Sequence, residues 1–352
     1  MSLNVFLDMK NKKIKIFLAA FLNYTNAQNI NCLSLSKHLD QKKYTVYSLS
    51  VYFKPKVKSN AIIFNCLYPF KISSKLGLLW GILVCDIAYF PKHQLAPKWM
   101  LKIANLLGKK IFTTIEANMC DISKERSMIK AFKSKRKMIN YFNNFKNIFP
   151  ITTYLRDNSK CGVNIDDRVL FLGVENCNFN PVVKEKLKNI IFIGTVEKAK
   201  GIHEYNELSK IYNNLNFHAV GDGPMKKTLE SDLNNRINFH GFVDNDKLDT
   251  ILKNIDLLIL PSKAEGFPKV ILEAASAGVP SIVYSDYGAN EWILNNDSGF
   301  VVNTFEQIRE SLDLLLKNKS EIKKRSVNAI KLSKNYDWKY IIKNWERIIS
   351  SL

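Results

Sequence analysis

Two glutamates stand eight positions apart in residues 260–280, which read LPSKAEGFPKVILEAASAGVP. The pattern predicts an apolar strand that ends at Leu260, then a loop, then a helix that begins near Pro268. The first turn of such a helix points its N–H groups and positive dipole toward the loop, which suits a phosphate. Two carboxylates near an anion site would be costly if their only role were packing, because like charges repel. Glu265 and Glu273 therefore make sense as acceptors for sugar hydroxyls. The alternative is a capping acid and a solvated helix acid.

Three more loops follow predicted strands and therefore belong to the carboxyl edge of a sheet, where α/β folds bind ligands. In GTVEKAKG, residues 194–201, Lys200 offers a point charge to a diphosphate, and a solvated lysine is the alternative. GDGPMKKTL, residues 221–229, resembles a dinucleotide fingerprint without its third glycine, and a tight turn with Pro224 in the first helical position is the alternative. In DYGANE we expect the final Glu291, near a helix start, either to have a structural role or to support residues that contact the ligand.

Metal, redox and nucleophilic chemistry are not indicated. The five histidines show no metal-ligand spacing, so we expect no metal site. Asp244-Asn245-Asp246 spells a D-x-D metal motif, but a helix cap is the better interpretation. The six cysteines, at 32, 66, 85, 120, 161 and 177, include no C-x-x-C pair, which favours a reduced, cytosolic compartment.

Short apolar runs alternate with amphipathic stretches along the whole chain, which predicts parallel α/β sheets. The strands expected in the first half are 14–20, 44–51, 61–65, 86–90, 110–115 and 148–152, with helices such as 27–39 and 98–107. The pattern restarts with strands at 189–194, 217–220, 237–239, 256–260, 281–284 and 300–302. Two successive units predict two Rossmann-like domains, with a hinge near 173–181 and a final amphipathic helix over 337–352.

The length of 352 residues also suggests two domains. With 46% hydrophobic and 24% charged residues, the composition excludes a disordered chain. The longest apolar run, residues 76–85, is too short to span a bilayer, and no signal peptide is visible. We therefore expect a protein that is not integral to a membrane.

The net charge of +20 is concentrated in the first half of the chain. Residues 1–180 contain 28 Lys and Arg against 10 Asp and Glu, whereas residues 181–352 contain 24 against 22. The first half should therefore meet an anionic surface, which could be nucleic acid, phospholipid or a phosphorylated substrate.

Taken together, the four loops resemble the nucleotide-binding half of the family-4 glycosyltransferases, which are retaining enzymes of the GT-B fold. The family pattern is G-R-x4-K-G, then G-x-G-P, then E-G-F-G with a second glutamate eight positions after the first, then G-G-x-x-E. The residues that match it are Gly194, Lys200, Gly201, Gly221, Gly223, Pro224, Glu265, Gly266, Phe267, Glu273, Gly288 and Glu291. The resemblance spans about residues 165–350 and includes LGVENCNF before the donor half and DWKYIIKNWERI at its end.

The resemblance implies two domains that face each other across a cleft. Residues 1–175 would form a basic acceptor domain, 176–335 the donor domain, and 336–352 a helix that crosses back to the first. The substrate would be a UDP- or GDP-sugar, with retention at the anomeric carbon and no obligatory cofactor or metal. The donor-binding residues would be Gly194, Thr195, Lys200, Gly221, Gly223, His240, Gly241, Phe242, Gly266, Phe267, Pro268, Lys269, Val270 and Glu273.

Within that set the resemblance implies distinct roles. Lys200 and the helix N-terminus before Val270 would stabilise the leaving diphosphate. Glu265 would orient the sugar, which makes Lys200 and Glu265 the catalytic candidates, and Glu273 would hold the ribose.

Several positions depart from the family pattern. Thr195 replaces an arginine that binds the diphosphate, and Lys198, Lys269 or Arg156 could substitute for it. In the first half, Asn26-Ala27-Gln28 replaces a Gly-Gly loop, and Glu116 in TTIEAN replaces a histidine. The acceptor-side candidates are Asn26, Gln28, Glu116 and Asn118.

The acceptor half also carries a run of cations in residues 124–137, KERSMIKAFKSKRK. As one helix, this run would bring Met128, Ile129 and Phe132 together, either packed into the domain or docked on an anionic leaflet with help from Lys54, Lys56 and Lys58. We expect a cytoplasmic protein on the inner face of a bacterial membrane, acting on a glycan or lipid-linked acceptor in polysaccharide or lipopolysaccharide assembly, without nucleic acid. The alternatives are a basic nucleic-acid-binding α/β protein and an inactive scaffold of the same fold.

Overall fold

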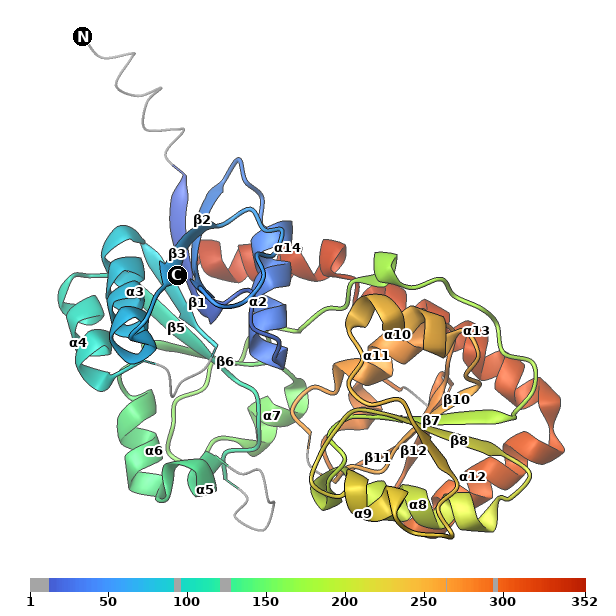
Figure 1. Cartoon of the computed structure of the whole chain (residues 1–352). Helices are drawn as coiled ribbons and strands as arrows, with labels where there is room; N and C mark the ends of the chain where they lie inside the picture. The colour runs from blue at the N-terminus through green and yellow to red at the C-terminus, as the bar shows by residue number, and fades with distance from the viewer. Residues whose placement is uncertain (1–12, 92–95, 121–127, 264, 294–296) are drawn as a thin grey trace.

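The computed structural model describes residues 13–91, 96–120, 128–263, 265–293 and 297–352. These residues form two α/β units, each built on a six-stranded parallel sheet with helices on its faces (Figure 1). The strand orders are β3-β2-β1-β4-β5-β6 in the first sheet and β12-β11-β10-β7-β8-β9 in the second.

The N-terminal unit contains strands β1 (Ile14–Phe21), β2 (Tyr44–Val51), β3 (Ile62–Cys66), β4 (Ile87–Phe90), β5 (Lys110–Ile115) and β6 (Asn147–Pro150). Its helices are α2 (Ala27–His38), α3 (Phe70–Val84), α4 (Lys98–Leu106), α5 (Met128–Phe132), α6 (Lys135–Phe142) and α7 (Thr153–Asn158). Six of the eight residues of β1 are buried, as expected for a central parallel strand with helices on both faces.

The C-terminal unit contains strands β7 (Asn189–Ile193), β8 (Asn216–Val220), β9 (Ile237–Phe239), β10 (Leu257–Leu260), β11 (Ser281–Tyr284) and β12 (Gly299–Val302). Its helices are α8 (Ile202–Ile211), α9 (Lys226–Glu230), α10 (Asn245–Leu252), α11 (Lys269–Ser276), α12 (Phe305–Lys317) and α13 (Lys319–Asn335), with short turns η1 (Asn176–Asn178), η2 (Lys198–Lys200) and η3 (Ala289–Glu291). The last helix, α14 (Trp338–Ser350), follows α13.

In both sheets the strand order reverses beside the first strand of the unit, between β1 and β4 and between β7 and β10. Loops diverge to opposite faces at such a reversal, and the crevice between them is where open α/β sheets bind ligands. The loops after β1 and β7 begin at these two crevices.

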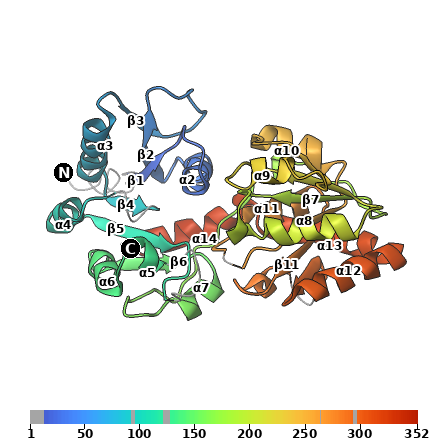
Figure 2. The same cartoon turned by 60° about the horizontal axis from the view of Figure 1, so that its bottom comes forward.

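Helix α14 packs on the N-terminal unit (Figure 2) although it ends the chain. Trp338 and Trp345 are fully buried in the hydrophobic cluster of the first sheet, and the Trp345 indole N–H donates to the Phe171 carbonyl at 2.8 Å. The chain crosses between the units twice, side by side, at the bridge of Val174 with Asp337. These two crossings support the domain boundaries that we propose, 175/176 between the two units and 335/336 before the final helix.

The predicted strands and helices are confirmed to within one or two residues at each end, except in the basic run 124–137. Residues 121–127, and with them the Lys124 end of the run, lie outside the described residues. The expectation of one helix is wrong, because Lys133 adopts a φ of 60° and Ser134 caps a new helix, α6. Met128 is buried, and Ile129 and Phe132 pack on the same core, which is the packing alternative.

Two further features concern chemistry. Cys120 and Cys161 are joined by a disulfide, so the expectation that all six cysteines stay reduced is wrong for these two, which lie 41 residues apart in sequence and are brought together only by the fold. Within the described residues, no helix is both long enough and apolar enough to cross a membrane.

Candidate active site

A cavity of about 700 Å³ lies between the two units. Its walls come from the loops that follow the carboxyl ends of β1, β5 and β6 on one side and of β7, β8, β9 and β10 on the other. The predicted residues that line it are Asn26, Gln28, Glu116, Asn118, Gly194, Thr195, Lys200, Gly221, Phe242, Gly266, Phe267, Pro268, Lys269, Val270, Glu265 and Glu273. The structure thus brings together residues from most of the loops that the sequence singled out.

The two catalytic candidates form an ion pair in the lining of this cavity. The Lys200 ammonium, at the end of η2, donates to the Glu265 carboxylate in the loop after β10. Their side chains are 13% and 8% exposed, so the pair is largely withdrawn from water. Each charge is satisfied by the other in this structure, and a diphosphate would have to share or displace the carboxylate to reach Lys200.

A second pair of charges lies one turn into α11. Lys269 and Glu273 are spaced i and i+4 on this helix, and the Lys269 Nζ donates to the Asn31 Oδ1 of α2 at 3.1 Å. Burial lowers the pKa of the Lys269 ammonium, against the opposing charges of Glu273 and Glu175. Burial raises the pKa of the Glu273 carboxyl, which the charge of Lys269 partly offsets. A hydroxyl or phosphate in the cavity would therefore meet a donor and an acceptor side by side.

Glycine permits close backbone approach at two positions of the site. A Cβ on Gly266 would stand 1.8 Å from the carbonyl oxygen of Glu116, so the loop after β10 touches the loop after β5 through bare backbone. A Cβ on Gly221, whose φ is 133°, would stand 1.9 Å from the carbonyl oxygen of Gly194. The first contact joins the two units across the cavity, and the second joins two neighbouring glycine loops.

The acceptor-side candidates lie together, and several already make internal bonds. Asn26 is the N-cap of α2 and accepts from the Asn29 backbone N–H at 2.9 Å. Glu116 accepts from the Thr114 hydroxyl at 2.8 Å, and Asn118 accepts from the Cys120 N–H at 3.0 Å. These bonds orient the side chains at the cavity wall.

Some predicted donor residues stand apart from the cavity wall. Gly223, His240 and Gly241 are outside the set of residues that line it. The His240 ring stacks on His218 at 5.3 Å, with Nε2 and Nδ1 3.1 Å apart, and burial together with the His240 charge lowers the pKa of His218. The Gly241 carbonyl accepts from the Gly221 N–H at 2.8 Å and so supports a loop that does line the cavity. Donor binding by these three residues stays a prediction.

The structure also adds residues that the motifs did not indicate. Asn31 lies one turn after Gln28 on α2, a spacing that could have signalled it once the helix start was placed at the cavity. Tyr287 lines the cavity, is 1% exposed, and its hydroxyl has no hydrogen-bond partner among the described residues. A buried hydroxyl without a partner is costly, so a ligand that supplies one would be favoured there.

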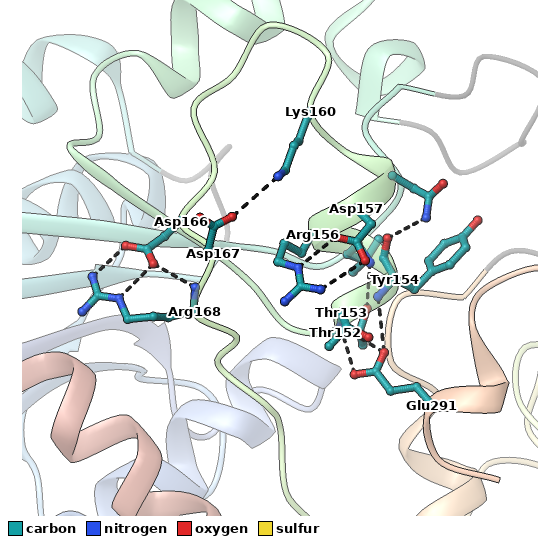
Figure 3. Close-up of polar contacts among 12 residues, drawn as sticks. Thr152, Thr153, Tyr154, Arg156, Asp157, Lys160, Asp166, Asp167, Arg168 and Glu291 are labelled. Atoms are coloured by element: carbon teal, nitrogen blue, oxygen red, sulfur yellow. Dashed lines mark hydrogen bonds and ion pairs between the residues drawn. The ribbon is translucent and has the colours of Figure 1, made fainter. Parts of the chain in front are cut away.

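Of the three cations that could replace the arginine at Thr195, the structure favours one. Arg156 pairs with its neighbour Asp157 at 2.8 Å (Figure 3), and both Arg156 and the exposed Lys198 are outside the set of residues that line the cavity. Lys269 lines the cavity together with Thr195. Lys269 is therefore the candidate that the geometry supports.

Glu291 makes the structural contact expected of it, but to the other unit. Its carboxylate accepts from the Thr153 N–H at 2.9 Å and 3.0 Å and from the Tyr154 N–H at 3.3 Å, at the first turn of α7 (Figure 3). The Tyr154 hydroxyl donates back to the Asp286 carbonyl at 2.9 Å. The loop after β11 is thus held against the N-terminal unit beside the cavity.

The described residues contain no cluster of three or more His, Cys, Asp or Glu side chains able to hold a metal ion. Asp244 is at the N-cap position of α10, as predicted, although its side chain forms no capping hydrogen bond.

Known glycosyltransferases are similar to this chain in sequence. Residues 175–332 match the family model described as glycosyl transferases group 1. An uncharacterized glycosyltransferase of Methanocaldococcus jannaschii is 32% identical over 196 residues, which is 51% of this chain and 50% of the relative. The poly(glycerol-phosphate) alpha-glucosyltransferase of Bacillus subtilis is 28% identical over 175 residues, 47% of this chain and 26% of the relative. The chain spans only 42% to 51% of the first three curated relatives it matches.

Solved structures extend the likeness to both units. Sucrose-phosphate synthase from Thermosynechococcus elongatus matches 96% of this chain and 99% of its own, with a TM-score of 0.78 and 13% identity. Anabaena HepE, solved in complex with UDP-glucose, matches 96% of this chain and 100% of its own, with a TM-score of 0.75 and 16% identity. The chain therefore has the two-sheet GT-B fold, and its residues 175–332 match the model of the glycosyl transferases group 1 family.

Proposed function

We propose that the protein is a retaining glycosyltransferase that moves a sugar from a nucleotide sugar to an acceptor hydroxyl. The observation that carries the proposal is the convergence of Lys200, Glu265 and Glu273 with the loops at Gly194 and Gly221 on one cavity between two sheets. This arrangement offers cations and helix N–H groups to a diphosphate and carboxylates to hydroxyl groups.

In the reaction, the anomeric C–O bond to the diphosphate breaks, and the diphosphate leaves with the electron pair. The acceptor oxygen bonds to the same face of the anomeric carbon, and its proton passes to an oxygen of the leaving diphosphate. Lys200 and Lys269 stabilise the negative charge that grows on the diphosphate. Glu265 holds the sugar hydroxyls and is drawn from its pairing with Lys200 as the diphosphate takes its place, while Glu273 holds the ribose.

The donor is a UDP- or GDP-sugar, and UDP is supported by the neighbours solved with UDP or UDP-glucose. The acceptor enters from the N-terminal unit, where Asn26, Gln28, Glu116 and Asn118 line the cavity. A glycan or lipid-linked acceptor in polysaccharide or lipopolysaccharide assembly fits the names of two relatives, a poly(glycerol-phosphate) alpha-glucosyltransferase and a putative glycosyltransferase of teichuronic acid biosynthesis. A cytoplasmic location at the inner face of the membrane follows from the lipid-linked case.

The test is to incubate the protein with UDP- and GDP-sugars and a lipid extract, and to measure nucleoside diphosphate release. Release that depends on both donor and extract supports the proposal, and an α-product from an α-donor, read by NMR of the anomeric proton, supports retention. Activity should persist in EDTA. Donor binding without turnover would indicate the inactive scaffold, and nucleic-acid binding without nucleotide-sugar binding would indicate the other alternative.

A further inference from the structure

The surface of the N-terminal unit is unusually apolar and unusually basic in one stretch of the chain. Residues 41–115 contain 12 Lys, no Arg and a single acid, Asp86, whose carboxylate accepts from the Lys15 N–H at 2.9 Å. Twelve of the twenty exposed large hydrophobic side chains in the described residues belong to this stretch: Tyr52, Phe53, Val57, Ile62, Leu67, Tyr68, Ile72, Leu76, Leu83, Trp99, Leu106 and Leu107. Contiguous exposed apolar surface marks an interaction site, whereas scattered single residues do not, so the informative members of this set are those that lie together.

Helix α3 is the centre of this surface, and it is apolar on both sides. Its inner side packs closely, because a Cβ on Gly81 would stand 2.4 Å from the Phe17 ring. Ile72, Leu76 and Leu83 are 60%, 55% and 52% exposed. At 100° per residue these three side chains share the side of the helix opposite to Gly81. Figure 2 shows α3 on the outer flank of the N-terminal unit, away from the second sheet.

Lysines and aromatic rings border the apolar stripe. Lys71 and Lys75 are exposed on the first turns of α3. Tyr52 follows β2 and Tyr68 follows β3, and the Tyr52 N–H donates to the Cys66 carbonyl, so the two loops are neighbours. Such a stripe of aliphatic side chains with tyrosines and lysines at its edge is the composition of interfacial membrane-binding segments. We call Tyr52, Phe53, Lys54, Leu67, Tyr68, Lys71, Ile72, Lys75, Leu76 and Leu83 the α3 face.

The α3 face reaches toward the mouth of the cavity. The Asn23 amide donates to the carbonyls of Val51 and Lys54 at 2.8 Å and 3.2 Å, which ties the loop after β1 to the loop after β2. The Lys54 ammonium lies 5.8 Å from the centre of the Tyr24 ring, and the residues after Tyr24 line the cavity. A molecule anchored in a surface that contacts the α3 face would therefore present its head group near the part of the cavity that the N-terminal unit lines.

We propose that the α3 face docks on the surface of an anionic lipid bilayer, with its aliphatic side chains at the headgroup boundary and its lysines on lipid phosphates. A second copy of the chain would place lysine against lysine, which disfavours self-association through this face. Nucleic acid would leave the aliphatic stripe in water. The proposal goes beyond the proposed function, since docking requires neither donor nor acceptor and is measured without turnover.

The experiment uses the full chain and two kinds of vesicle, phosphatidylcholine alone and an equal mixture of phosphatidylcholine and phosphatidylglycerol. We expect co-sedimentation with the mixed vesicles at about 0.05 M salt and its loss near 0.5 M, because the screening length falls to a few ångströms. Equal binding to neutral vesicles, or none to anionic vesicles at low salt, would overturn the proposal. A dimer in sedimentation equilibrium that the α3-face variants abolish would assign the face to a second copy instead.

Variants locate the docking surface. Replacing Lys54, Lys71 and Lys75 by Gln should weaken vesicle binding about a hundredfold, at roughly fivefold for each cation near the surface. The double substitution Ile72→Ser and Leu76→Ser should weaken it at least about tenfold, because less apolar area enters the lipid. All five side chains are exposed, so an unchanged melting temperature is expected and separates lost docking from lost folding.

Matched controls come from other surfaces of the chain. Ile211→Ser with Leu233→Ser removes two exposed aliphatic side chains from the C-terminal unit, and Lys135→Gln with Lys137→Gln removes cations from α6. Both controls should bind anionic vesicles as the unmodified chain does. If the α6 variant loses binding and the α3-face variants keep it, the docking surface is the basic run 124–137 and the present assignment is wrong.

Discussion

Substituting Gly266 by alanine tests whether the two units work in the contact that the structure shows. The new Cβ would stand 1.8 Å from the Glu116 carbonyl oxygen and 2.7 Å from its carbon, with backbone on both sides of the contact. Cβ atoms keep at least 3.0 Å from such atoms, so the loop after β10 must withdraw by about 1.2 Å, the difference between the two distances. Glu265 is the next residue, and its pairing with Lys200 would move with the loop.

A displacement of about 1 Å at reacting groups costs on the order of a hundredfold in rate. We therefore expect Gly266→Ala to lower kcat about a hundredfold while nucleoside diphosphate affinity, measured by calorimetry, changes only a few-fold. Gly108→Ala is the control for a position with open space, because a Cβ there meets nothing within 4 Å and any effect reports the strain of alanine at a φ of 66°. Wild-type turnover in Gly266→Ala would show that the loops are not in this contact during the reaction and would refute the reasoning.

Further substitutions at four positions test individual side chains. Glu273→Ala should weaken nucleoside diphosphate binding by about 1.5–3 kcal/mol in calorimetry, as expected for the loss of a charge-assisted hydrogen bond. Glu265→Ala should lower kcat more than it lowers donor affinity. Full activity in both variants would contradict the assignment of the site. Because burial raises the pKa of Glu273, donor binding should weaken as pH falls through a range above that of an ordinary glutamate, and this acid limb should vanish in Glu273→Gln. Thr195→Arg should tighten diphosphate binding about tenfold by fluorescence titration if no cation fills that place, and weaker binding would mean that Lys269 already does. Tyr287→Phe removes a buried hydroxyl that has no hydrogen-bond partner among the described residues, so chemical denaturation should show an unfolding free energy about 1 kcal/mol higher. The variant should also have a lower kcat/KM, because the ligand loses its contact with the hydroxyl. A less stable, fully active variant would exclude a role of Tyr287 in ligand binding.

The local parts of this site were predictable from the sequence. Strands β2, β5, β9 and β11 have the predicted bounds, because short apolar runs between turn residues leave few alternatives. The glycine loops were predictable because their backbone conformation requires glycine: Gly221 adopts a φ of 133° and Gly201 one of 77°, which other residues rarely adopt. The start of α11 after Pro268 followed from the same local rules.

Contacts between distant segments were not predictable in this way. The Lys269–Asn31 bond joins residues 238 positions apart, and Glu291 reaches the start of α7 across 138 positions. Each partner alone reads as an ordinary polar residue of a helix or loop. Only the placement of two sheets against each other turns them into a cavity wall and a clamp between units, and no local pattern encodes that placement. The Cys120–Cys161 disulfide belongs to the same class.

The location of apolar surface is the hardest feature to predict, since sequence patterns equate hydrophobic with buried. On that rule the stripe of Ile72, Leu76 and Leu83 belongs to the core, and the cations of 124–137 belong to the surface that meets an anionic partner. The structure reverses the first half of this inference, because Gly77 and Gly81 let α3 pack through its inner side and leave the stripe outside. Near 124–137 the apolar residues pack inward instead. A helix with small residues on one side and large aliphatic residues on the other is therefore ambiguous in sequence. The glycines, which permit close packing, are the better sign of which side faces the core.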